Sequence, residues 1–226
     1  MLKNGQFSFL KKLSLSVLIM ISLFLLCLWG VFAMADMVFE DKGVAFDQHI
    51  FDLIRPLVNS TLTNVMLVIT FLGSQNFLLP ANILLILFYL LVRENKKGAF
   101  QILTISLTSV IAMFAIKFFL QRERPLTPLI AKVHGYSFPS GHTFTSVTFY
   151  GIIAYIVYRN VKNVGLRWLI IVLLIIFVFL VGFSRVYLRL HYASDVIAGF
   201  CLGLMWLILA DIFLVKTRQT KLGQGI

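Results

Sequence analysis

Cysteine is scarce in this sequence, with two copies among 226 residues. Cys27 and Cys201 both lie in the middle of apolar segments, so the pattern indicates neither a disulfide framework nor a cysteine-based metal site. Acidic residues are also few, nine against twenty Lys and Arg, which gives a net charge of +11. Such a charge can indicate nucleic-acid binding, but most of these basic residues lie in short connectors between apolar runs. The sequence therefore predicts no nucleic-acid partner.

Apolar sequence is abundant: 60% of the residues are hydrophobic, and Phe alone occurs 22 times. Soluble globular proteins contain about 45–50% apolar residues. A helix of about 20 apolar residues crosses the roughly 30 Å of hydrocarbon in a bilayer. Because the length suits one domain, we expect residues 1–226 to form a single integral membrane domain.

Six apolar runs are long enough to be predicted as membrane spans, so the expected fold class is an all-α bundle of six transmembrane helices. The first run follows a basic segment and also resembles a signal peptide. It is long for that role, and we interpret it as a retained anchor. The predicted spans are residues 13–35, 77–92, 99–120, 143–158, 168–183 and 193–215.

A short helical region is predicted between the first two spans. Residues 36–60 are acidic and mixed, and Phe46, Ile50 and Ile54 recur there at helical spacing, which favours a short helix along the membrane interface. Residues 62–72 are apolar, but as a helix they would rise only about 16 Å, too little to cross. This segment is expected to be interfacial or re-entrant.

The distribution of basic residues predicts the orientation. With the N-terminus inside and six spans, twelve of the twenty Lys and Arg residues are cytoplasmic and eight are outside. Five of the outer eight belong to candidate site motifs, and without them the bias is twelve to three, as the positive-inside rule requires. We expect both termini in the cytoplasm and the site on the outer or periplasmic face; the family resemblance described below implies the inner membrane of a bacterium.

Residues 184–195, SRVYLRLHYASD, place ionisable groups at the edge of apolar sequence, where they are costly and usually functional. On a helix, His191 and Asp195 share one face, so the carboxylate can accept the proton of one imidazole nitrogen and leave the other nitrogen free. A free imidazole nitrogen beside arginines suits attack on a phosphoryl group. Snorkelling of these side chains at the membrane boundary is the alternative that this stretch alone leaves open.

Two further stretches are predicted to meet it at the outer ends of the spans. One runs from Lys117 to Arg124-Pro125 at the end of the third span. The other is Pro139-Ser140-Gly141-His142, where Ser140 is a natural N-cap and the following amides open the fourth span. Cations, a helix N-terminus and two histidines together make a pocket for a tetrahedral oxyanion.

These stretches resemble the three signature motifs of the type-2 phosphatidic acid phosphatase superfamily, Lys-x6-Arg-Pro, Pro-Ser-Gly-His and Ser-Arg-x5-His-x3-Asp, and all their fixed residues are present. The resemblance implies a metal-independent lipid phosphatase without a cofactor. It implies that His191 is a nucleophile that forms a phosphohistidine, oriented by Asp195, and that His142 protonates the leaving oxygen. The implied phosphate-binding residues are Lys117, Arg124, Ser140, Gly141 and Arg185.

Within the superfamily, the six-span form with an acidic first outer loop resembles bacterial phosphatidylglycerophosphatase B-type and undecaprenyl-diphosphate phosphatase-type enzymes. The expected substrate is phosphatidylglycerophosphate, phosphatidate or a polyprenyl diphosphate in the bilayer. The alternatives are a lipid phosphotransferase with the same site, a haloperoxidase, which six spans disfavour, and a non-catalytic transporter or scaffold.

Several other residues receive weaker assignments. Arg122 lies at a variable motif position, and so does Arg189, for which a phosphate contact, a lipid headgroup contact and snorkelling remain open. His49 and His134 match no motif and are interpreted as solvated loop residues. Gly199 and Gly203 form a GxxxG pattern, which we interpret as close helix packing rather than a dimer face.

Overall fold

The computed structural model describes residues 15–39, 43–131 and 134–222, and within these ranges it is all-helical, with no strand. The predicted all-α class is therefore confirmed. The helices are α2 (Leu15–Phe39), α3 (Gly43–Ile54), a 3-10 turn (Arg55–Leu57), α4 (Ser60–Leu72), α5 (Gln75–Leu87) with a π-helical extension (Phe88–Val92), α6 (Lys96–Leu120), α7 (Gly141–Asn160), α8 (Val164–Tyr187) and α9 (Ala193–Leu222).

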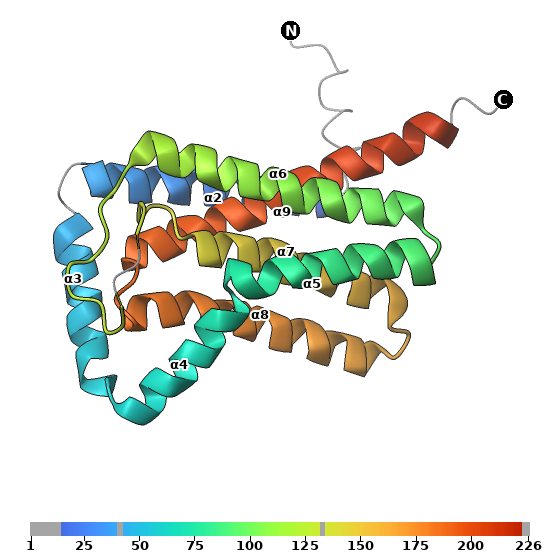
Figure 1. Cartoon of the computed structure of the whole chain (residues 1–226). Coiled ribbons are helices and arrows are strands. Elements are labelled where there is room, and N and C mark those ends of the chain that lie inside the picture. The colour runs from blue at the N-terminus through green and yellow to red at the C-terminus, as the bar shows by residue number, and fades with distance from the viewer. Residues whose placement is uncertain (1–14, 40–42, 132–133, 223–226) are drawn as a thin grey trace, which may run out of the picture.

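The longer helices run along a common direction, and the shorter helices α3 and α4 lie at one end of them (Figure 1). In Figure 1, α3 crosses that end and α4 leads diagonally back to α5. Helix α7 contacts α5, α6, α8 and α9, and α2 packs along α9. Because α7 has neighbours on several sides, its side chains face protein more than those of any helix at the edge.

Among the residues that the structure describes, five helices are long and apolar enough to cross a membrane: residues 17–38, 75–92, 96–120, 164–187 and 193–213. They expose large apolar side chains such as Leu25, Leu84, Phe100 and Leu169, as lipid-facing helices do. The chain is an integral membrane protein with several spans. The remaining predicted span, residues 143–158, corresponds to α7, which has 20 residues and would reach about 30 Å, and its crossing stays a prediction.

Helix α7 is less apolar because it is internal, with Thr143, Ser146 and Thr148 buried. Glycines on α9 let the two helices approach closely: a Cβ on Gly203 would lie 2.6 Å from the Cβ of Val147. A Cβ on Gly199 would lie 2.8 Å from the carbonyl oxygen of Ser140. The interpretation of the GxxxG pattern as close helix packing is confirmed, and this contact joins the starts of α7 and α9.

The region after the first span is helical, as predicted. Helix α3 buries Phe51 in a cluster with Val186, Ala193 and Val196 of the α8–α9 corner. Helix α4 has 13 residues, about 20 Å, which is too short to cross. It packs against α8 instead and brings the Gly73-Ser74 turn back into the bundle. Gly73 of this turn is buried against Val181 of α8 and Ser146 of α7, which sets where α5 begins.

The two ends of the bundle differ in chemistry, and this gives a test of orientation. We expect a single cysteine at Glu123, on the exposed connector after α6, to react with an impermeant thiol reagent applied to intact cells. A cysteine at Lys162, between α7 and α8, should react only after the membrane is opened. The background lacks Cys27 and Cys201. Labelling of position 162 in intact cells would contradict the orientation.

Candidate active site

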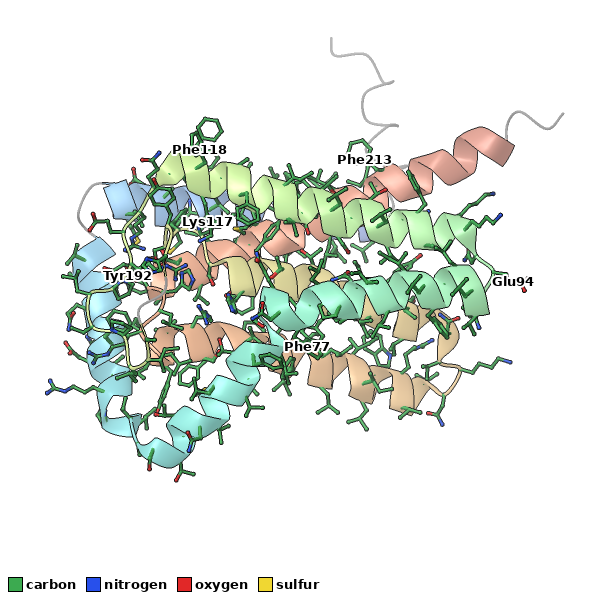
Figure 2. The ribbon with its side chains drawn as sticks, viewed as in Figure 1. Phe77, Glu94, Lys117, Phe118, Tyr192 and Phe213 are labelled. Carbon is green, nitrogen blue, oxygen red and sulfur yellow. The ribbon has the colours of Figure 1, made fainter. Side chains whose placement is uncertain are left out.

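A cavity of about 730 Å³ opens at the end of the bundle that carries α3. Figure 2 places Lys117 and Tyr192 at this end, whereas Glu94 lies at the opposite end. The cavity is formed by the connector from α6 to α7, the start of α7, the turn before α9 and the junction of α4 with α5. Its lining residues are Ser74, Gln75, Asn76, Phe114, Lys117, Phe118, Arg124, His134, Gly135, Tyr136, Gly141, His142 and His191.

A tight turn after α8 positions His191. Helix α8 ends at Tyr187, and Arg189 adopts a left-handed backbone with φ of 54°. The amides of Leu190 and His191 both donate back to the carbonyl oxygen of Arg185. His191 is therefore held by backbone hydrogen bonds, and its side chain is 1% exposed.

The neighbours of His191 determine its tautomer. Arg124 Nη1 lies 3.1 Å from His191 Nε2, and because a guanidinium can only donate, Nε2 is the acceptor. The proton of the neutral ring is then on Nδ1, which lies 3.3 Å from Asp195 Oδ2. The lone pair of the neutral ring is therefore on Nε2, the nitrogen that faces Arg124, while Nδ1 faces the carboxylate.

Asp195 is fully buried and is held by several donors. Its Oδ2 accepts hydrogen bonds from the Ser137 hydroxyl and, at 2.9 Å, from the backbone amide of Tyr192. Its Oδ1 accepts a hydrogen bond from Arg122 Nη1 at 2.6 Å. The carboxylate is thus fixed in place beside the imidazole.

Two cations of the first motif reach the cavity and also shape its wall. Lys117 Nζ donates to the carbonyl oxygen of Tyr136 at 2.6 Å. Arg124 Nε donates to the carbonyl oxygen of Gly135 at 2.9 Å, and its Nη1 donates to that of Leu190 at 2.8 Å. A positively charged edge therefore faces His191.

Arg185 lies behind the cavity, 3% exposed, and donates from Nη1 to the Thr70 hydroxyl at 2.7 Å. Its Nε has no hydrogen-bond partner among the described residues. A buried guanidinium with an unused donor is unusual because such groups are normally fully hydrogen-bonded. The vacant donor is suited to an anionic oxygen.

The start of α7 also faces the cavity. Ser140 is the N-cap, and its hydroxyl accepts hydrogen bonds from the amide and the hydroxyl of Thr143. Gly141 and His142 line the cavity, where free amides at a helix N-terminus attract anions. Of the eight predicted site residues, five line the cavity, and Ser140, Arg185 and Asp195 lie behind it.

The structure adds residues that the sequence reasoning missed. Ser137 and Thr70 contact the predicted site residues Asp195 and Arg185, and Asp47 contacts Arg122. Arg122, which had received no role, is bound to Asp195. His134 is exposed, as predicted for a loop residue, but it lines the cavity, whereas His49 is exposed on α3 outside the lining. Arg189 contacts Thr127 and the ring of Phe51.

Metal ligands are not clustered in the part of the chain that the structure describes, where no three His, Cys, Asp or Glu side chains gather suitably. Among the residues that line the cavity with His191 are the cations Lys117 and Arg124 and the first residues of α7. Such a set binds an anion of tetrahedral shape, such as phosphate, with hydrogen bonds from several sides.

The fold and the site thus define an integral membrane protein with a cavity at one end of its helices that is lined by cations and histidines. A comparison with known families matches residues 98–219 to the PAP2 superfamily, and the chain belongs to that superfamily. The matched range contains all three motifs and every residue predicted for the site.

Two characterised relatives are similar over most of their length. Phosphatidylglycerophosphatase B of Bacillus subtilis (strain 168) is 29% identical over 169 residues, which cover 74% of this chain and 80% of the relative. An undecaprenyl-diphosphatase of Sulfolobus acidocaldarius is 28% identical over 187 residues, which cover 80% of this chain and 84% of the relative. Both are phosphatases of membrane lipids by name.

Solved structures show the same fold. A transmembrane PAP2-type phosphatidylglycerolphosphate phosphatase from Bacillus subtilis superposes with a TM-score of 0.75 at 28% identity, covering 87% of this chain and 96% of that one. Aquifex aeolicus LpxE superposes with a TM-score of 0.56 at 23% identity, covering 75% and 94%, and shows the likeness of the fold alone. The chain therefore belongs to the PAP2-type membrane lipid phosphatase family.

The surroundings of His191 lower its basicity. Burial, and then the positive charges of Arg185 and Arg124, hold the pKa of His191 well below its ordinary value of 6.5. In the unfolded chain this histidine takes up a proton as the pH falls below about 6.5. The unfolded state then binds more protons than the folded state, so His191 makes folding less stable as the pH falls.

We therefore expect the thermal unfolding midpoint, Tm, of the wild type in detergent to fall between pH 7.5 and pH 5. In His191→Gln the fall should be smaller by about 2–4 °C, the shift that about 1 kcal/mol produces in a chain of this size. Tm measured against pH for both proteins checks this, with His49→Gln as the exposed control. Identical falls in the wild type and His191→Gln would contradict the neutral state of His191.

Proposed function

We propose that this protein hydrolyses a phosphate ester or diphosphate of a membrane lipid at the outer membrane face, through a phosphohistidine formed on His191. One observation carries the proposal: His191 Nε2 faces the cavity as an acceptor, while its Nδ1–H is directed at a buried carboxylate. Such a nitrogen is a nucleophile that a fixed partner orients. The cations around it are placed to bind the equatorial oxygens of a transferring phosphoryl group.

The reaction begins when the substrate phosphate enters between Lys117, Arg124 and the amides of α7. Phosphate oxygens replace His191 Nε2 as the acceptor of Arg124 Nη1, which frees the lone pair for attack. The N–P bond forms as the bond from phosphorus to the leaving oxygen breaks. His142, which lies on the cavity wall and enters the cycle in its protonated form, donates that proton to the leaving oxygen and becomes neutral.

Asp195 accepts the hydrogen bond of Nδ1–H throughout and stabilises the positive charge that the ring acquires on phosphorylation. In the second half, a water molecule loses its proton to His142 and attacks phosphorus, and the N–P bond breaks to release inorganic phosphate. The imidazole returns to its neutral form with the proton still on Nδ1. Atoms and charge therefore balance over the cycle.

An apolar groove next to the cavity supports a lipid substrate. This groove has a volume of about 270 Å³ and runs between α5, α6 and α7. It shares Gln75 and Phe114 with the cavity, so the two lie next to each other. Leu79 and Leu107 line it and are also exposed on the side of the bundle, 64% and 54% respectively, where a bilayer would lie. A hydrocarbon chain in this groove would place its phosphate near His191.

The names of the relatives guide the choice of substrates to test. Those names refer to phosphatidylglycerophosphate and to undecaprenyl diphosphate. For both, the reacting phosphate is joined to a group anchored by long apolar chains, as the groove requires. We propose that the substrate is one of these lipids or phosphatidate. The positive-inside bias of the sequence supports an outer location for the cavity end.

The roles of the two histidines can be distinguished by comparing substrates that have different leaving groups. We expect His191→Ala to abolish the burst of leaving group on every substrate, because no covalent intermediate forms. His142→Ala should slow the burst about 10²–10⁴-fold on a lipid monophosphate, whose alkoxide needs a proton, and much less on nitrophenyl phosphate. Rapid mixing with each substrate measures both rates.

His49→Ala is the matched control, since this histidine is exposed on α3 outside the cavity lining and should leave both bursts unchanged. A normal burst in His191→Ala would contradict the nucleophile assignment and with it the proposed function. Equal losses on both substrates in His142→Ala would contradict the role as general acid.

We also infer that hydrolysis needs no metal ion, because Lys117, Arg124 and Arg185 supply the positive charge that Mg²⁺ supplies in many phosphoryl transfers. Activity on any of the three lipids should persist in excess chelator. Vanadate, which adopts the five-coordinate shape of the transition state, should inhibit. Loss of phosphate release in chelator, with recovery on adding a divalent cation, would be the contrary result.

A further inference from the structure

Behind Asp195, on the side away from the cavity, lies a second buried carboxylate. Asp47 of α3 is 1% exposed, and Arg122 lies between the two acids. Arg122 Nη2 is 2.7 Å from Asp47 Oδ2, and Arg122 Nη1 is 2.6 Å from Asp195 Oδ1. One guanidinium is thus shared by two carboxylates, and its side chain is only 12% exposed.

Ser194 closes this arrangement on the other side. Its amide donates to Asp47 Oδ1 at 3.0 Å and its hydroxyl donates to Asp47 Oδ2 at 2.7 Å. The same hydroxyl accepts a hydrogen bond from Arg122 Nη1 at 2.8 Å. Because Ser194 lies in the first turn of α9, Asp47 satisfies an amide that the helix itself leaves unpaired. The residue next to Asp195 is therefore tied to α3.

Apolar packing holds Asp47 in position. On α3, Phe51 is buried against Val186 and Val196, and Phe46 and Ile50 flank the same cluster. Arg122 is also restrained, since its guanidinium stacks on the ring of Tyr192 at 4.0 Å from the centroid. The guanidinium therefore cannot swing away without losing contacts on three elements: α3, the turn before α9, and α9 itself.

This network controls how strongly Asp195 binds the imidazole. Asp195 Oδ2 faces His191 Nδ1, and Oδ1 faces Arg122. A guanidinium that binds one carboxylate alone gives it the full attraction of a charge pair and reduces its strength as an acceptor for other donors. With Asp47 present, the charge of Arg122 is divided, and Asp195 keeps more negative charge for His191. In a buried site such differences are screened little.

We propose that Asp47 and Arg122 are positioning residues that set the orientation and charge of Asp195, and through it the reactivity of His191. Neither residue lines the cavity, so neither is a phosphate ligand. The proposal rests on the proposed function, in that His191 is the reacting group. It makes α3, a helix outside the predicted spans, part of the machinery of the site.

The test is Asp47→Asn in the full-length protein, which removes one charge and keeps the shape of the side chain. We expect the rate of the nitrophenolate burst at saturating nitrophenyl phosphate to fall at least about tenfold, since small displacements of a reacting group have effects of this order. The KM should change by less than about twofold, because substrate contacts remain. Asp52→Asn is the matched control. It removes the same charge from the exposed side of α3, where Asp52 accepts a hydrogen bond from Gln48, and should leave both quantities unchanged.

The rate is expressed per folded molecule, with Tm and the burst amplitude of each variant measured in the same detergent. If Asp47→Asn does not fold, the same measurements are made on Arg122→Lys. A lysine keeps the positive charge but lacks the forked guanidinium that binds both carboxylates. A slowed burst with normal KM in either variant supports the proposal. A normal rate per folded molecule, or a raised KM with a normal rate, overturns it. A burst retained in His191→Ala would instead refute the proposed function.

Discussion

The carboxylate of Asp195 has to stay charged where water does not reach it, and much of the structure around it follows from that requirement. A buried charge is tolerated only when partners surround it. Asp195 has four, the Nδ1–H of His191, the hydroxyl of Ser137, the amide of Tyr192 and the guanidinium of Arg122. These come from the connector between α6 and α7 and from the turn before α9, which are thereby fixed against each other.

The bilayer and the polar site impose opposite demands on the helices. Helices at the edge, such as α5 and α8, expose apolar side chains along their length, whereas α7 buries small polar ones. The chain meets both demands by placing its most polar helix among other helices and opening that helix at the cavity. Close packing at Gly199 and Gly203 then sets the start of α7 against the start of α9.

The motifs and the alternation of apolar runs were sufficient to predict the all-helical class, and they also predicted which stretches meet. His191, Arg124 and Lys117 could be found because each stands at a fixed place beside a predicted helix end. Asp47 and Thr70 could not, since they lie on α3 and α4, and no local pattern says how these two helices fold back on the bundle. Arg122 was noted in the sequence. Whether its side chain points to solvent or binds a second carboxylate depends on where α3 packs against the bundle, which the sequence does not show.

The apolar groove between α5, α6 and α7 has a kinetic consequence for a substrate that reaches the cavity through it. Such a molecule moves in two dimensions and never leaves the bilayer, so the quantity that the protein senses is the number of substrate molecules per unit of membrane area. Adding inert lipid to the same membrane would dilute the substrate and slow the encounter, even at constant bulk concentration. For a protein with this opening, the substrate concentration that gives half-saturation is properly expressed as a mole fraction of substrate in the membrane.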